Sequence, residues 1–397
     1  MRPEHNPGER PALLEELEPA TRRVLLLASM VLFFETIFFT ALAPLLPHYE
    51  ESFDISKSGA GILTAAYAAG AFIGAVPAGL LTLRWGVRTA VLLGLVLLAV
   101  GSLAFGFANS VSTLNGARCI QGIGSSMAWT GALTWLVTVA PRSRRGEVLG
   151  IALGAAVGGS LAGPAVGAIA VRIGTEATFS FIGCLGLFLI GLACSTPPPR
   201  PVADRLRSMI QALQNGAAAA GAYLLLFSAL LLGAWSVLAP LQLDDLGWSA
   251  GEIAGLFLAS SAITMLFTPR LGKWSDRHGR VPLILAALVL SSLVSLGLAV
   301  TARPLTFALF IVAAGVAFSS TWVPGTALLS DGTERAGIGL AIGFVLFNLA
   351  WTPGFLAGAA AGGWLASATS NSVAYFSLAA VCVTTLVGAL FLGVRNR

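Results

Sequence analysis

Long apolar segments recur along almost the whole chain, and each is long enough to cross a lipid bilayer as a helix. A hydrocarbon core about 30 Å thick needs roughly 20 apolar residues per helix. By this rule the chain predicts twelve spans, at about residues 22–47, 59–82, 89–109, 112–139, 148–173, 177–195, 217–241, 250–269, 281–301, 304–329, 336–366 and 372–394. The runs are continuous and lack a period of two, so they predict helices and not the strands of a β-barrel. Because 56% of the residues are hydrophobic and only 10% are charged, we expect an all-α membrane protein.

Polar stretches separate these spans into two sets of six. Residues 1–21 carry five acids and no apolar h-region, which predicts a cytoplasmic tail and not a cleaved signal peptide. Residues 196–216 hold prolines, charges and amides, which predict a central cytoplasmic loop with a short surface helix near 203–214. We therefore expect an N-terminal six-helix bundle over 22–195 and a C-terminal bundle with a short tail over 217–397.

The basic residues predict the orientation of the chain in the membrane. Of 23 Lys and Arg residues, only Lys57, Arg172 and Arg303 fall in the loops opposite the termini, and Arg118 alone lies inside a span. Loops rich in Lys and Arg stay in the cytoplasm, so both termini are expected there, in a multi-pass protein of the cell membrane. Anionic lipids explain the basic pI near 9.4, so no nucleic-acid partner is expected. The four cysteines have no Cys-x-x-Cys pairing, and we expect neither a metal site nor a cofactor.

The two halves resemble each other at an offset of about 193 to 195 residues. GLLTLRWGVR at 79–88 parallels GKWSDRHGR at 272–280, and GSLAGPAVGA at 159–168 parallels GFLAGAAAGG at 354–363. Two six-helix bundles in parallel repeat are implied, with a cavity between them near the middle of the membrane.

In these motifs the chain resembles the major facilitator superfamily. GKWSDRHGR fits the family's loop motif Gly-x-x-x-Asp-Arg-x-Gly-Arg, whose charges latch the cytoplasmic side in that family, although the first copy has Leu83 at the position of the Asp. The resemblance assigns a conformational latch to Gly79, Arg84, Gly86, Gly272, Asp276, Arg277, Gly279 and Arg280.

Three further stretches carry the resemblance. LNGARCIQGIG at 114–124 resembles the fourth-helix pattern in which the arginine, here Arg118, is associated with proton coupling. GIALGAAVGGSLAGPAVGA at 150–168 resembles the fifth-helix pattern of the antiporter branches, and its helix-packing residues are Gly159, Gly163, Pro164 and Gly167. ETIFFTALAPLLP at 35–47 is similar to the first helix of drug and vesicular amine antiporters, which favours the drug:proton antiporter branch.

Glu35 is the one clear acid inside a span. It lies twelve residues after Arg23, or about 18 Å along a helix, which is near the membrane midplane. A charged carboxylate facing lipid there is costly, so it must face a cavity, find a partner or take up a proton. We expect Glu35 and Arg118 to couple transport to protons; the alternatives are a structural carboxyl group for Glu35 and snorkelling to the interface for Arg118. The sequence does not decide whether Glu35 and Arg118 touch.

Candidates for the wall of the substrate cavity are Phe38, Phe39, Gln121, Trp129, Trp235, Asn348 and Trp351.

Three function classes can be compared. A proton-driven exporter of small lipophilic molecules, with cations as one class, agrees best with Glu35, Arg118 and the span-five pattern. Uptake of a small polar metabolite by proton symport is the alternative, although few embedded polar groups are present to bind a sugar. No enzyme is expected, because the sequence holds no Ser-His-Asp set, metal cluster or P-loop. The expected partners are a small-molecule substrate, protons and the lipid bilayer, and the expected state is a monomer.

Overall fold

The structure, a computed structural model, describes residues 17–141, 144–199, 214–301 and 303–395, and it is entirely helical over this part of the chain. The surface helix expected near 203–214 lies almost wholly outside these residues. The first half contains α2 (Pro19–Thr40), η1 (Ala43–Leu45), α3 (Leu46–Phe53), α4 (Lys57–Trp85), α5 (Val87–Gly106), α6 (Val111–Val139), α7 (Arg145–Ile173) and α8 (Thr175–Ser195). The second half contains α10 (Gly216–Asp245), α11 (Ala250–His278), α12 (Arg280–Val300), α13 (Pro304–Ser320), α14 (Trp322–Arg335), α15 (Leu340–Ala368) and α16 (Asn371–Arg395).

Eleven helical segments in the described part of the chain are long and apolar enough to cross a membrane. The fourth expected span, α6, is not among them although it has 29 residues. Its sequence is richer in polar groups, and Arg118 and Gln121 on it are buried inside the protein. A helix surrounded by other helices can carry such groups without placing them in lipid.

Two expected spans are interrupted. The first was expected to end at residue 47, but α2 ends at Thr40, and after a turn and the short 3-10 helix η1, which contains Pro44, the chain continues as α3 to Phe53. A proline lacks the backbone N–H that the helix needs, so the break follows from its chemistry. The tenth span is divided at Thr321 into α13 and α14.

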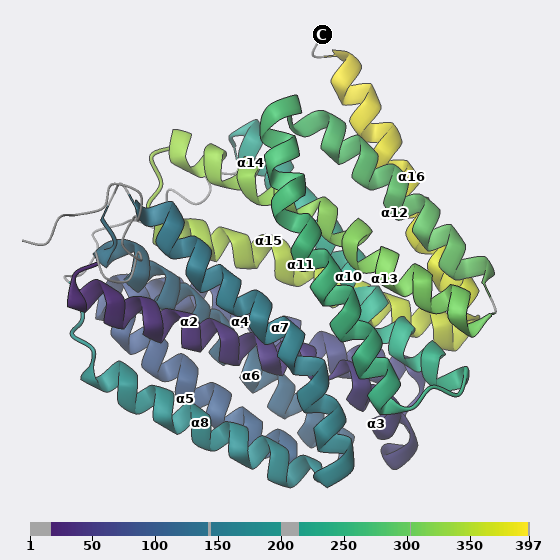
Figure 1. Cartoon of the computed structure of the whole chain (residues 1–397), viewed down its shortest axis with the longest axis horizontal. Helices are drawn as coiled ribbons and strands as arrows, with labels where there is room; N and C mark the ends of the chain where they lie inside the picture. The colour runs from purple at the N-terminus through teal and green to yellow at the C-terminus, as the bar shows by residue number, and fades with distance from the viewer. Residues whose placement is uncertain (1–16, 142–143, 200–213, 302, 396–397) are drawn as a thin grey trace, which may run out of the picture.

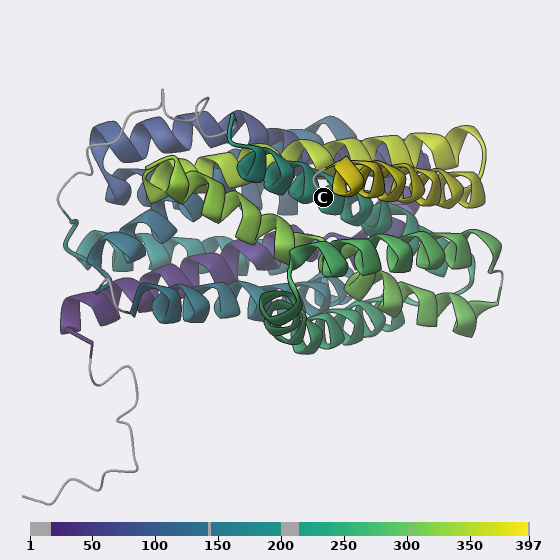
Figure 2. The same cartoon turned by 90° about the horizontal axis from the view of Figure 1, so that it is seen from above.

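The helices form two groups that follow the two halves of the chain. In Figure 1 the purple-to-teal helices α2 and α4–α8 lie together, and most green-to-yellow helices lie together beside them. The boundary is crossed where α15 packs against α4 and where α11 packs against α7. Figure 2 shows the same long helices from above, running side by side. The arrangement places α2, α4 and α6 around the interior of the first group, with α15 against α4.

Glycines permit the close packing of α7 on α2. A Cβ on Gly159 would collide with the carbonyl oxygen of Phe33, and one on Gly163 would lie 2.9 Å from the carbonyl oxygen of Ile37. Gly167 faces Ala41 in the same way, and Pro164 lies inside α7 between these contacts. The row of glycines therefore lets the α7 backbone approach the chain closely from Phe33 to Ala41, at the C-terminal end of α2.

Single glycines connect two pairs of helices at equivalent positions of the two halves. Gly86 joins α4 to α5 with φ 86° and ψ 161°, and Gly279 joins α11 to α12 with φ 88° and ψ 162°. This backbone region is open essentially to glycine alone. The equivalent glycine in each copy of the loop motif therefore makes the same sharp reversal of the chain.

The two groups meet closely at one end of the molecule, which we call the Lys57 end. The Lys57 Nζ lies 2.6 Å from Asp245 Oδ2, so an ion pair joins the start of α4 to the end of α10. One turn further along α4, a Cβ on Gly61 would lie 2.6 Å from the carbonyl oxygen of Ala359 and 3.1 Å from the Cα of Gly363. The backbones of α4 and α15 are therefore in direct contact at this end.

Candidate functional site

The carboxylate of Glu35 is buried among three hydroxyl groups. Its Oε1 atom accepts hydrogen bonds from the Tyr67 hydroxyl at 2.6 Å and from the Ser125 Oγ at 2.5 Å. Its Oε2 atom accepts one from the Thr36 Oγ1 at 3.2 Å. The donors come from α4, α6 and α2, so three helices position one acid that is only 7% exposed. Donors placed in this way stabilise the carboxylate whenever it is charged.

Arg118 is buried beside this acid on α6. Its Nη1 atom donates to the carbonyl oxygen of Phe38 at 3.0 Å and to Gln121 Oε1 at 3.1 Å. Its guanidinium carbon lies 4.5 Å from the centroid of the Tyr67 ring and 5.9 Å from that of Phe105. Aromatic faces attract a cation that has lost its water. The Nε atom of Arg118 is buried without a hydrogen-bond partner in the described part of the chain.

Tyr67 lies between the acid and the base. Among the described residues Glu35 and Arg118 form no ion pair; the Tyr67 hydroxyl contacts the first and the Tyr67 ring lies under the second. The side chain is 2% exposed. On the question left open by the sequence, the structure shows that both groups contact Tyr67 and that no ion pair joins them directly.

Phe38 and Phe39 point in different directions despite being neighbours. Phe38 is 1% exposed and packs edge-on against Phe34, at 4.9 Å between ring centroids, inside the first group. Phe39 instead packs 5.4 Å from Trp351 and 4.9 Å from Phe355, both on α15 of the second group. Trp351 and Phe355 stack on each other at 5.0 Å. We call Phe39, Trp351 and Phe355 the boundary cluster, because it joins the two groups.

The remaining cavity candidates divide between this boundary and the interior of the second group. Asn348, also on α15, donates through Nδ2 to the Thr130 Oγ1 of α6 at 3.4 Å, and Trp129 is half-buried beside Thr130. Trp235 packs 4.7 Å from Phe257 within the second group. The structure therefore brings Glu35, Arg118, Gln121 and Phe39 close together, and it does not bring Trp235 to them.

Sequence reasoning missed several contributors, namely Tyr67, Ser125, Phe355 and the threonines Thr36 and Thr130. Tyr67 follows Lys57 by ten residues, or about 15 Å of helix, so its depth could have been estimated as that of Glu35 was. A tyrosine is one of the few residues in an apolar helix that must find a partner for a hydroxyl. The serine and the phenylalanine carried no such signal, because small hydroxyls and aromatic rings are common in these helices.

The latch candidates take part in contacts within one half and across the boundary. Arg280 Nη2 lies 2.7 Å from Asp331 Oδ2 on α14, so this pair is internal to the second half. A Cβ on Gly79 of α4 would lie 2.7 Å from Val345 Cγ2 of α15, so this glycine lies at the boundary. Arg84 and Arg277 are exposed, Gly272 has only Val323 within 4.0 Å of its Cβ position, and the side chain of Asp276 lies outside the described set.

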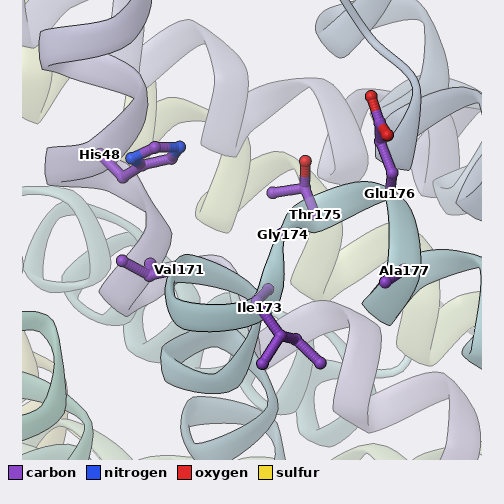
Figure 3. A pocket seen from close by; sticks show the side chains of 8 residues that line it. His48, Val171, Ile173, Gly174, Thr175, Glu176 and Ala177 are labelled. Atoms are coloured by element: carbon purple, nitrogen blue, oxygen red, sulfur yellow. The ribbon is translucent and has the colours of Figure 1, made fainter.

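A hollow of about 300 Å³ lies away from these residues. It is lined by His48, Val171, Thr175, Glu176 and their neighbours near the α7–α8 turn, and Figure 3 shows His48 facing this turn from another helix. None of the residues proposed for coupling or for the substrate cavity lines it. The hollow is therefore separate from the Glu35 site.

A bundle of long apolar helices that buries a hydrogen-bonded acid at its centre defines a polytopic membrane protein of the transporter class. The family model described as Major Facilitator Superfamily matches residues 28–238 and 221–397, so the chain belongs to this family. Its members are transporters of small molecules and not enzymes, and the chain is accordingly a multi-pass membrane transporter.

Individual relatives agree with the family. An uncharacterized MFS-type transporter of Methanocaldococcus jannaschii is 23% identical over 339 residues, which cover 82% of this chain and 86% of that protein. The quinolone resistance protein NorA of Staphylococcus aureus is 26% identical over 144 residues, which cover 36% of this chain and only 37% of NorA. The crystal structure of a D-xylose-proton symporter superposes with a TM-score of 0.76 at 19% identity, covering 92% of this chain and 96% of that one, and shows the shared fold.

Proposed function

We propose that the protein is a proton-coupled exporter that exchanges protons for small lipophilic molecules, cations among them. The observation that carries the proposal is the Glu35 carboxylate, buried and held by hydroxyl donors from Tyr67, Ser125 and Thr36. Such a group can alternate between a charged and a protonated form, which coupling to a proton gradient requires. The name of the NorA relative supports export, although the match covers about a third of that protein.

The surroundings of Glu35 support a lipophilic substrate. The boundary cluster of Phe39, Trp351 and Phe355 lies next to Tyr67, at 5.5 Å from the Phe39 ring to the Tyr67 ring. Aromatic faces beside an acid suit flat molecules and cations through stacking and cation–π attraction. Few polar groups at this boundary are suited to a sugar; Asn348 and Thr130 provide the hydrogen bond between α15 and α6 there.

The finer topology belongs to the same proposal. With α6 counted as a span beside the eleven apolar segments, the chain has twelve, in two bundles over 22–195 and 217–397. The distribution of Lys and Arg places residues 1–21, the loop 196–216 and both termini in the cytoplasm. The Lys57 end then faces outward, and the protein acts as a monomer in the cell membrane.

The ion pair at the Lys57 end, Glu35 and the loop motif together support an alternating-access cycle. With the Lys57 end closed by the Lys57–Asp245 ion pair, Glu35 releases its proton toward the cytoplasm and binds the substrate. The halves then rock, the Lys57 end opens, and the substrate leaves as Glu35 takes up a proton outside. On the cytoplasmic side, the loop-motif residues Asp276, Arg277 and Arg280 latch the halves and so stabilise the outward-open state; Arg280 pairs with Asp331 in the present conformation.

The test uses inside-out vesicles with an acidic interior. Addition of a transported cation such as ethidium should collapse the proton gradient with the native protein, and Glu35→Gln should abolish this response while remaining in the membrane. Glu147→Gln is the matched control, because Glu147 is exposed in the first turn of α7. An unchanged response of Glu35→Gln would overturn the role of Glu35, and uptake of a polar metabolite into right-side-out vesicles under an inward proton gradient would establish symport instead.

A further inference from the structure

We infer that Tyr67 is the positioning residue that links the protonation of Glu35 to the contact between the two groups of helices; the inference rests on the proposed proton-coupled function. No motif in the sequence points to this tyrosine. Its position in the structure does, because one side chain contacts the acid, the base and the boundary cluster.

Three contacts of Tyr67 define the link. The hydroxyl donates to Glu35 Oε1 at 2.6 Å, and the ring lies 4.5 Å from the Arg118 guanidinium carbon. On its other side the ring is 5.5 Å from the ring of Phe39, which packs against Trp351 of the second group. A path of direct contacts therefore runs from the carboxylate to the opposite half of the protein.

The backbone of Tyr67 is fixed, so the side chain must do the moving. A Cβ on Gly122 of α6 would collide with the carbonyl oxygen of Tyr67 and lie 2.7 Å from the backbone nitrogen of Ala71. α4 and α6 are thus in backbone contact at this level, and neither helix can slide without loss of packing. A change at Glu35 is transmitted by rotation or release of the Tyr67 ring.

The charge on Glu35 determines how firmly Tyr67 is held. A carboxylate binds a hydroxyl donor more strongly than a protonated acid does, and here Oε1 receives two donors, from Tyr67 and Ser125. When a proton from water binds the carboxylate, or a cationic substrate takes its place as partner, the Tyr67 hydroxyl loses that charged acceptor. The ring is then free to leave its position between Arg118 and Phe39, which loosens the boundary cluster.

Other charged groups around Glu35 are few. α6 contributes Arg118, and α3 contributes only the uncharged phenol of Tyr49, which lies near Arg118. The charged side chains of α7 and α8 stand near the helix ends, at Arg145, Glu147, Arg172 and Glu176, and the described side chains of α15 include none. The pH response of this region therefore originates at Glu35, with Tyr67 as its hydrogen-bond partner and Arg118 as the nearby cation that contacts the Tyr67 ring.

The main test is Tyr67→Phe, which removes one oxygen and keeps the ring. In proteoliposomes we expect the midpoint of the pH profile of ethidium efflux to move upward by about one pH unit, because the charged carboxylate loses one of its donors. The maximal rate should fall several-fold with little change in KM. Tyr375→Phe is the matched control, since Tyr375 is fully buried in the second half and its hydroxyl has no partner in the described part of the chain; its midpoint should stay at the native value.

A second variant tests the opposite direction. Incorporation of 3-fluorotyrosine at position 67 makes the hydroxyl a stronger donor, so the midpoint should move downward. A midpoint that is unchanged in both variants, with folded protein and with Glu35→Gln inactive, would overturn the role of Tyr67 and leave the exporter proposal standing.

A substrate-free measurement separates the two proposals. Protonation of Glu35 should change the tryptophan fluorescence of the purified full-length protein through Trp351, and Glu35→Gln should lack this transition. If the native protein moves no ethidium under any gradient, the exporter proposal fails, whereas a transition that shifts upward in Tyr67→Phe still supports the link. Absence of a shift there would reject it.

Discussion

The ammonium group of Lys57 contacts two helices of the opposite half at once. Its Nζ atom lies 2.6 Å from Asp245 Oδ2 at the end of α10 and 3.4 Å from Asn371 Oδ1 at the start of α16. The side chains of Lys57 and Asp245 are 24% and 53% exposed, so water weakens their attraction. Exposed pairs contribute about 0.2–1 kcal/mol, which is enough to favour a closed end and weak enough to open in every cycle.

Removal of one charge should therefore open the Lys57 end modestly. In Lys57→Ala or Asp245→Ala we expect the open population to rise by a factor of about 1.4 to 5, the range that corresponds to 0.2–1 kcal/mol. Distances between spin labels at the loops of this end would measure it. The exchanged double variant Lys57→Asp with Asp245→Lys should restore the native distribution, and a population unaffected by either single change would contradict a role for the pair.

The contact between α4 and α15 at Gly363 leaves no room for an added methyl group. A Cβ on Gly363 would lie 2.5 Å from the carbonyl oxygen of Lys57 and 2.9 Å from the Cα of Gly61, so Gly363→Ala must push the helices apart. Overpacking of this kind costs about 1–3 kcal/mol, and we expect a lower melting temperature in detergent. Gly343→Ala on the same helix is the control, because no neighbouring atom of the described residues lies within 4 Å of that Cβ position. Equal melting temperatures for the two variants would be inconsistent with the contact.

Loss of the Trp351 indole should impair recognition of aromatic cations. Trp351→Ala removes the ring that contacts both Phe39 and Phe355, and we expect the apparent KM for ethidium to rise about tenfold through lost stacking and cation–π attraction. Concentration-dependent efflux from vesicles measures this. Trp364→Ala, also on α15 but 60% exposed, should leave the KM unchanged. A rise of the same size in both variants would indicate a general packing defect.

Much of the fold could be predicted from hydropathy alone, because a bilayer imposes a minimum length on every apolar helix. The end of α4 at Trp85 was predictable to within a few residues, but the end of α11 at His278 was not, because that span was expected to end near 269 and residues 272–280 were expected in a loop. The continuation of the first span to Phe53 was not, since two prolines in ALAPLLP suggested an end while tertiary packing maintained helical structure beyond them. The composition of α6 alone is too polar for a typical membrane span, but its polar side chains Arg118 and Gln121 are buried among other helices.

For the site, the sequence could place Glu35 and Arg118 by depth but could not define how they interact. The direction of a side chain around a helix axis decides this: Phe38 turns into its own group and Phe39 toward α15, although they are consecutive. Tyr67 escaped notice because an isolated aromatic residue in a membrane helix usually faces lipid or a neighbour. Contacts between distant helices, such as Tyr67 with Glu35, depend on the packing of both α4 and α2 against α6.

The paired reversals at Gly86 and Gly279 offer an internal comparison between the two halves. Their dihedral angles agree within two degrees, yet the Asp of the second motif copy corresponds to Leu83 in the first. One molecule thus displays the same backbone bend with and without the acid, so the bend does not depend on that charge. The glycine determines the shape of the corner, so the acid found in only one of the two halves is not needed for the bend.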